Sequence, residues 1–213
     1  MPRTKPANCR THVFFDGQSL FNSAKRCFGY SYPNFDPLKL AAAATAMEAG
    51  RTLVKTHFYT GVHRAHENAF WHGFWTNKLN AVKRGGGANV LVTHRPLKYS
   101  DQPVEVTPGV FKSVRVGREK GIDIRIALDL VRLARKREYD VAVVFSQDQD
   151  LVEAVDEVKA ISAELDHWIR IECVYPDCAG NSNPRGINGT VWRRLDKASY
   201  DACIDPKDYR PNP

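Results

Sequence analysis

The sequence predicts an α/β fold in which helices cover both faces of a mostly parallel β-sheet. Short apolar segments of strand character lie at 11–15, 53–60, 89–95, 139–145 and 170–175. Helical patterns separate most of these segments, and such alternation is typical of a parallel sheet. The 213 residues suffice for one well-buried domain with elaborations.

Helix-start and helix-stop signals justify the segments between the strands. Residues 19–29 form a short helix or turn after the first strand. Asp36-Pro37 begins a helix that extends to Gly50, because Asp accepts bonds from free N–H groups and Pro suits the first turn. A long helix is predicted over 64–84, where Phe70, Trp71, Phe74 and Trp75 share one face. Two more helices are expected over 122–136 and 150–165.

The remaining segments define the domain organisation. Residues 1–10 are expected to form a flexible arm, residues 11–175 the main domain, and residues 176–213 a C-terminal extension packed on it. Between the third strand and the next helix, the polar stretch 98–109 is a loop or hairpin. It is followed by the alternating basic segment 110–116.

Charge and composition indicate the partner and the cellular location. The formal net charge of +7 and the pI of about 9.2 favour polyanions, with nucleic acid as the usual candidate. No apolar run approaches the roughly 20 residues of a membrane span, and the N-terminus lacks the apolar core of a secretory signal. Five cysteines without a short CxxC pair predict reduced thiols and a cytoplasmic protein that binds no membrane. The aromatic helix 64–84 suggests a possible homodimer.

Carboxylates follow two of the predicted strands. Asp148 and Asp150 follow shortly after the apolar run 141–145, and Asp16 ends the first strand, whereas Asp123 begins a helix. Right-handed crossovers bring the carboxyl ends of parallel strands to one edge, so we expect these four acids to converge there. Clustered carboxylates repel one another unless a cation compensates them, and hard oxygen ligands suit Mg²⁺ or Mn²⁺. The sequence therefore predicts a divalent metal site at this edge.

Each acid also has a purely structural interpretation. Asp16 precedes Gly17 and is suited to a turn, and Asp123 is suited to a helix N-cap. Asp129 lies six residues beyond Asp123 within an apolar stripe, which favours a structural or supporting role, with direct metal contact left open.

Basic and polar residues near these acids are candidates for substrate binding. The cations of the segment 112–120 lead directly to Asp123 and suit a phosphate backbone. Amide and hydroxyl groups near the strand ends can donate to phosphate oxygens. The predicted substrate-binding residues are Gln18, Asn22, Lys112, Arg115, Arg118, Lys120 and Ser146.

Three segments together resemble the signatures of the NYN domain, a group of PIN-like ribonucleases that includes the LabA-like proteins. They are FFDGQSLFN, EKGIDIRIALDLV and VVFSQDQDLVEAV, within roughly 11–175. The resemblance implies a PIN-like three-layer α/β/α sandwich and metal-dependent RNA cleavage. The metal-binding acids of the family match Asp16, Asp123, Asp148 and Asp150 by motif. Gln18 stands where the family often has Asn, and Gln147 where it often has Gly, which suggests a narrower mouth of the site.

The leading hypothesis is an endoribonuclease that hydrolyses RNA with a metal-activated water. One alternative is a non-catalytic RNA-binding or regulatory module of the same fold. A haloacid-dehalogenase-type phosphatase is disfavoured, because Gln18 occupies the place of that chemistry's second carboxylate. The sequence leaves open which RNA is the substrate, or whether DNA is cut.

Overall fold

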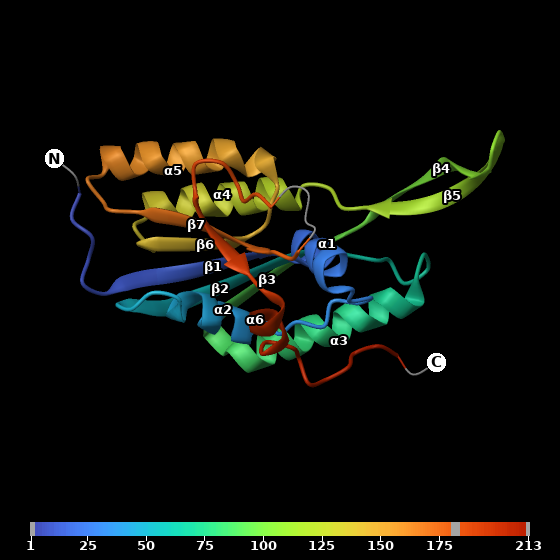
Figure 1. The fold of residues 1–213 in the computed structure, drawn as a ribbon, viewed down its shortest axis with the longest axis horizontal. Helices are drawn as coiled ribbons and strands as arrows, with labels where there is room; N and C mark the ends of the chain where they lie inside the picture. Colours follow the sequence, from blue (N-terminus) through green and yellow to red (C-terminus); the bar gives the residue numbers. More distant parts are fainter. Residues whose placement is uncertain (1–2, 180–183, 212–213) are drawn as a thin grey trace.

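A computed structural model describes residues 3–179 and 184–211. Six strands form one sheet in the order β3-β2-β1-β6-β7-β8, and each neighbouring pair is parallel (Figure 1). This confirms the predicted α/β class. The strands are β1 Cys9–Asp16, β2 Arg51–Val62, β3 Val90–Pro96, β6 Val141–Phe145, β7 Arg170–Pro176 and β8 Val191–Leu195.

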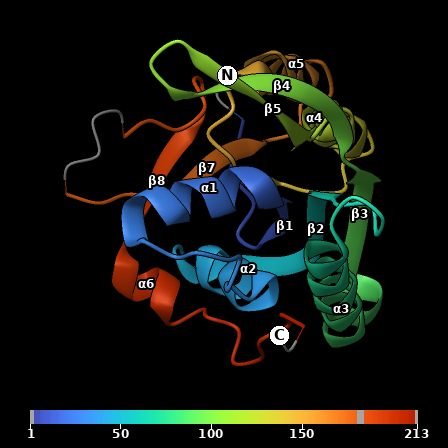
Figure 2. The same ribbon diagram turned by 90° about the vertical axis from the view of Figure 1, so that its right-hand side faces the viewer.

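Helices cover both faces of the sheet, as the sequence predicts (Figures 1 and 2). α4 and α5 pack on one face in a hydrophobic cluster that includes Phe14, and the other helices share a second cluster that includes Phe15. Successive strand residues thus point into opposite layers. The helices are α1 Gly17–Phe28, α2 Pro37–Ala46, α3 Ala69–Gly86, α4 Ile122–Arg135, α5 Val152–Glu164 and α6 Lys197–Asp201, with short 3₁₀ turns η1 Gly87–Asn89 and η2 Gln149–Leu151.

The central strands β1 and β6 set the geometry of the sheet edge. Both are buried on their two faces, and Phe15 pairs in register with Phe145. Asp16 directly follows Phe15, and Ser146 directly follows Phe145. The two residues therefore lie side by side at this edge of the sheet. Gly17 begins α1 at once, and a side chain there would collide with the ring of Phe58 and the backbone of β2.

A β-hairpin stands out from the body between β3 and α4. β4 Lys98–Thr107 and β5 Val110–Arg118 pair antiparallel to each other and to no other strand of the described chain (Figure 1). The sequence did not decide whether the stretch 98–109 forms a loop or a hairpin. Both ends of the hairpin return to the carboxyl edge of the main sheet.

The C-terminal extension contributes to the sheet itself. β8 pairs with β7 as the sixth strand, and a backbone bridge joins Phe35 to Ile204 near the end of α6. The sequence had placed the last core strand at 170–175.

The expectation that all cysteines are reduced thiols is wrong for two of them. Cys27 at the end of α1 forms a disulfide with Cys178, 151 residues later, after β7. Sequence spacing gives no indication of this pair, because only the packing of α1 beside β7 brings the two residues together. Cys9, Cys173 and Cys203 are free and buried.

Much of the aromatic face of α3 is used inside the chain. Phe74 and Trp75 are buried in the core together with Leu79, whereas Phe70 remains exposed. The aromatic pattern is thus explained by packing under the sheet, and the homodimer stays a prediction. None of the helices in the described ranges is long and apolar enough to cross a membrane.

Candidate active site

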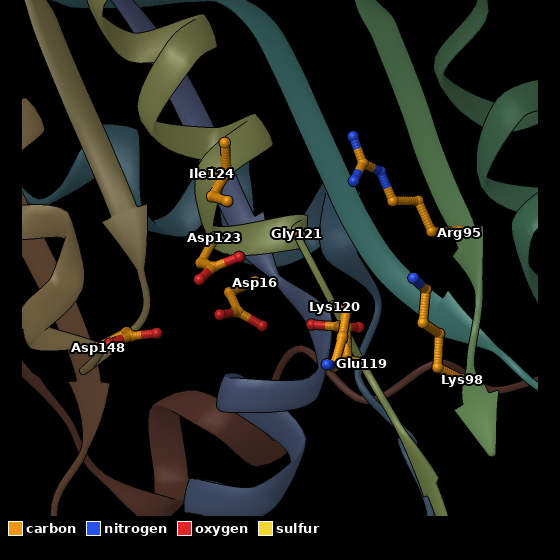
Figure 3. A pocket seen from close by; sticks show the side chains of 9 residues that line it. All are labelled: Asp16, Arg95, Lys98, Glu119, Lys120, Gly121, Asp123, Ile124 and Asp148. Carbon is orange, nitrogen blue, oxygen red and sulfur yellow. The ribbon is translucent and has the colours of Figure 1, made fainter. Parts of the chain in front are cut away.

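A cleft of about 520 Å³ lies at the carboxyl edge of the sheet, at the root of the hairpin. It is lined by the carboxylates of Asp16, Glu119, Asp123 and Asp148, which come from three separate segments of the chain (Figure 3). Three of these four residues are among the predicted metal-binding acids. The predicted convergence of Asp16, Asp123 and Asp148 at one edge therefore agrees with their placement in the structure.

Asp16 lies at the bottom of the cleft, between β1 and α1. One carboxylate oxygen accepts a bond from the Ser19 N–H at 2.9 Å, and the other accepts one from the Ser146 hydroxyl at 3.3 Å. Asp16 is therefore the N-cap of α1 and also lines the cleft. Its structural interpretation and its interpretation as a site residue are thus compatible. Burial, with the nearby charge of Asp148, raises its pKa to about 6.

Asp123 lies in the first turn of α4, where the helix dipole favours a negative side chain. The N-cap of this helix is Gly121 and not Asp123. Gly121 has a φ of 75°, and a side chain there would collide with the guanidinium of Arg95. The cap interpretation of Asp123 is thus wrong, and its carboxylate is left to line the cleft.

The loop after β6 places Asp148 and Asp150 beside Asp123. One carboxylate oxygen from each of these three residues lies within 4.8 Å of the others. Ser146 supports this loop, since its hydroxyl accepts a bond from the Asp148 N–H at 3.2 Å while it donates to Asp16. Asp150 is exposed at the margin of the group, and its N–H donates to Asp148.

The glutamines of the same loop point away from the acids. Gln147 accepts from the Ser23 hydroxyl at 2.8 Å and donates to the Arg185 carbonyl at 2.7 Å. Gln149 donates to the Gly186 carbonyl at 3.0 Å. The expectation that Gln147 narrows the mouth of the site is therefore wrong. Both side chains instead attach the loop to the segment before β8.

Glu119 is a member of the site that the sequence analysis missed. It lies within the basic stretch 112–120, where it seemed only to offset the charge of the neighbouring cations. Its Oε2 atom is buried and has no hydrogen-bond partner within the described chain. Burial, followed by the charges of Asp16 and Asp123, raises its pKa to about 7. The signal in the sequence was its position four residues before Asp123, in the connection from the hairpin to α4.

Basic side chains also line the cleft. Arg95 and Lys98, which the sequence analysis missed, lie on the side of the cleft away from Asp148, whereas Lys120, which was predicted to bind substrate, lines the cleft next to Glu119 in the chain (Figure 3). Arg95 is the penultimate residue of β3, and Lys98 begins the hairpin. Acidic and basic side chains thus line the same cleft, an arrangement suited to a phosphate group held beside a cation.

The other predicted substrate-binding residues lie outside the cleft lining. Lys112, Arg115 and Arg118 are on β5 of the hairpin, and Asn22 is exposed on α1 beyond the half-buried Gln18. Ser146 is buried beneath the acids, where it positions Asp16 and Asp148.

Asp129 has a structural environment. It is buried on α4, accepts from the Tyr59 hydroxyl at 2.9 Å, and forms ion pairs with Arg125 and Arg132 at 2.8 and 3.0 Å. These partners satisfy its charge, in line with the predicted supporting role. It belongs neither to the acidic group nor to the lining of the cleft.

The donor set fits a hard divalent cation. Asp123, Asp148 and Asp150 offer three carboxylate oxygens at compatible spacing, and Asp16 and Glu119 add two carboxylates nearby. All are oxygen donors, and the cluster contains neither His nor Cys, which favours Mg²⁺ or Mn²⁺ over softer metals. The unpartnered Oε2 of Glu119 and the raised pKa of Asp16 are also what a cation or its waters would offset.

Comparison with known proteins assigns the family. The NYN domain model matches residues 10–165, well over half of the chain. A comparison with curated proteins gave no match. A crystal structure of a protein of unknown function from Vibrio parahaemolyticus is similar at 15% identity and a TM-score of 0.47, covering 97% of this chain and 98% of that one. NYN domains are generally nucleases with a PIN-like fold and typically use divalent metals. On the family match, the chain belongs to the NYN domain family.

Proposed function

We propose that this protein is a metal-dependent endoribonuclease whose active site is the acidic cleft at the carboxyl edge of the sheet. The observation that supports this most directly is the group formed by Asp123, Asp148 and Asp150, with Asp16 and Glu119 beside it. Membership of a nuclease family supports the reaction class. The basic residues that line the cleft support binding of a phosphodiester.

Each part of the cleft has a role in this proposal. Asp123, Asp148 and Asp150 hold Mg²⁺ or Mn²⁺, and Asp16 and Glu119 complete its surroundings. When bound, the cation neutralises charge on the phosphodiester and lowers the pKa of water. Arg95 and Lys98 orient the phosphate from the side opposite Asp148, and Lys120 adds a third positive charge that offsets the charge of the phosphate.

The test is cleavage of a circular RNA by the unaltered protein and by Asp148→Asn, with Mn²⁺ or with EDTA. A circle is cut only by an endonuclease. We expect the unaltered protein to linearise it in Mn²⁺ and not in EDTA. Asp148→Asn should lower the rate by at least about 100-fold, because it removes a charged ligand from the group that holds the cation.

Asp156→Asn is the matched control. This carboxylate is on α5, exposed and paired with Lys159, outside the cleft. It should leave the rate unchanged. Equal rates for Asp148→Asn and the unaltered protein would refute the site, and binding of RNA without any cleavage would favour the non-catalytic module instead. A circular single-stranded DNA of the same sequence distinguishes ribonuclease from general nuclease activity.

Two finer assignments are part of the same proposal. The LabA-like group is the subgroup that we infer from the resemblance of the three signature segments. A cytoplasmic location is what we infer for a ribonuclease of this class. Reduction of the Cys27–Cys178 disulfide in intact cells would be consistent with that location.

A further inference from the structure

The hairpin of β4 and β5 has two faces of opposite electrostatic character. Two residues directly opposite each other on the two strands point to the same face of the hairpin. Successive pairs along the strands alternate between the two faces, so every second pair lies on the same face. By this rule Lys98 and Arg118 form one pair, and Lys112 lies farther out on the same face, opposite Val104. We call this the basic face. It carries three cations and, within this fully described hairpin, no carboxylate.

The opposite face carries the hairpin's carboxylates and its connection to the body. Asp101 and Arg115 form one pair on this face, and Glu105 lies beyond them. Arg115 donates to Glu67 at 2.7 Å and stacks over Tyr99, whose hydroxyl is hydrogen-bonded to His63. This face is therefore fastened at its root to the segment before α3.

The basic face has no comparable partners. Arg118 donates to the neutral side chain of Gln102 on the same face, and Lys112 has no ion pair in the described chain. Between these cations lie the exposed valines Val104 and Val114. A surface of unpaired cations with small apolar groups between them suits phosphates and sugars of a polynucleotide.

The basic face is continuous with the cleft. Lys98 belongs to both, and Figure 3 shows its side chain on the same side of the cleft as Arg95. Val104, which is opposite Lys112, lies six residues beyond Lys98 on β4. At about 3.3 Å per residue, this distance is roughly 20 Å. A strand with about 3.4 Å between stacked nucleotides covers it with about six of them.

We propose that the basic face of the hairpin is an extended binding track for the RNA strand that leaves the acidic cleft. This rests on the proposed function and deepens it, because it gives the enzyme a substrate of minimum length. Lys98 and Arg118 bind the phosphates nearest the cleft, and Lys112 binds one about six nucleotides away. Arg115 is a brace for the hairpin and not an RNA ligand.

The test adds one charge to either face. Ser100→Lys places a cation on the basic face, and Ser113→Lys places the same cation on the opposite face, at an equally exposed serine. Lys112→Gln removes the distal cation. All are made in the Asp148→Asn background with Mg²⁺, so that RNA binds without turnover. Fluorescence anisotropy measures binding of oligouridine shorter than about six nucleotides and of oligouridine about twice that length, across a range of salt.

We expect Lys112→Gln to weaken binding of the long oligomer only and to lower its salt slope by about one. Ser100→Lys should raise that slope, and Ser113→Lys should not. Equal gains from the two lysine variants would overturn the face assignment. So would a dimer in light scattering that Lys112→Gln dissociates, because the face would then be a subunit interface. If the background protein binds neither oligomer, the proposed function itself fails and the track fails with it.

Discussion

At the scale of single residues, the site depends on side chains that hold the acids in place. Gln147 and Gln149 alternate with Asp148 and Asp150 along the loop. The two glutamines bond to the segment before β8, whereas the two aspartates belong to the acidic group. Alternation after a strand was visible in the sequence. The carbonyls that anchor the two glutamines were not, because they lie on a segment 37 or 38 residues farther along.

Gln149→Ala should therefore weaken metal binding without removing a metal ligand. It frees the loop from Gly186 and leaves Asp148 and Asp150 less ordered. Loss of such a supporting contact typically costs about 10- to 100-fold in metal affinity. Titration of Mn²⁺ by electron paramagnetic resonance measures the dissociation constant directly. Gln102→Ala on the hairpin is the matched control, and an equal loss in both variants would contradict a positioning role for Gln149.

The residues that the sequence predicted and those it missed differ in a physical way. Asp16 and Asp148 follow parallel neighbours, and the parallel topology alone brings their side chains together. Glu119 and Lys98 reach the cleft only because the hairpin folds back on itself with Lys98 opposite Arg118. That register depends on a turn at Pro108-Gly109 and on cross-strand pairs, which local periodicity does not specify.

At the scale of elements, the core strands and helices were predictable because their apolar patterns are long and buried. β8 was not, since VWRRL is short and two of its apolar residues, Val191 and Trp192, are exposed at the sheet edge. Packing selects this strand: its backbone pairs with β7, and the Trp192 indole donates to the Ile187 carbonyl at 2.8 Å.

The disulfide should contribute to stability by linking α1 to the segment that leads into β8. Cys27 and Cys178 close a loop of about 150 residues, and such links typically contribute about 2–4 kcal/mol, chiefly by restricting the unfolded chain. Reduction, or Cys27→Ser with Cys178→Ser, should lower the urea midpoint accordingly. The double variant should not respond to reductant. Five free thiols in the native protein under air would contradict the pairing.

At the scale of the whole molecule, the charge distribution of the interior links stability to pH. His12 and His57 are buried side by side, with ring nitrogens 3.2 Å apart and Phe14 stacked on His57. Burial lowers the pKa of His12 to about 4 and that of His57 to about 3. Asp140 differs: burial alone raises its pKa, but hydrogen bonds from Arg10 and His167 outweigh this and lower it to about 2.

These shifts predict that stability falls with acid in two separate steps. An unfolded histidine takes up a proton near pH 6.5, whereas the folded pair resists it, so stability is lost as pH falls from about 6.5 toward 4. Each histidine should cost about 3 kcal/mol over this window, at about 1.4 kcal/mol per pH unit. Asp140 affects stability at a lower pH, because folding lowers the pKa of its carboxyl group. Its contribution of about 2 kcal/mol to the free energy of unfolding persists above pH 4 and disappears between about pH 4 and pH 2.

Urea unfolding from pH 7.5 to 2.5 separates the two steps, because a substitution at each site reduces only its own. His57→Phe keeps an aromatic ring against Phe14 and should roughly halve the upper step, because His12 still contributes, while leaving the lower step unchanged. Asp140→Asn should lower stability at neutral pH, since Arg10 and His167 lose their charged partner, and should flatten the lower step only. Both groups lie away from the acidic cleft lining, so the difference in stability between each variant and the unaltered protein should be the same with and without Mg²⁺ at each pH. An upper step that survives His57→Phe at full size would show that other groups carry the acid sensitivity.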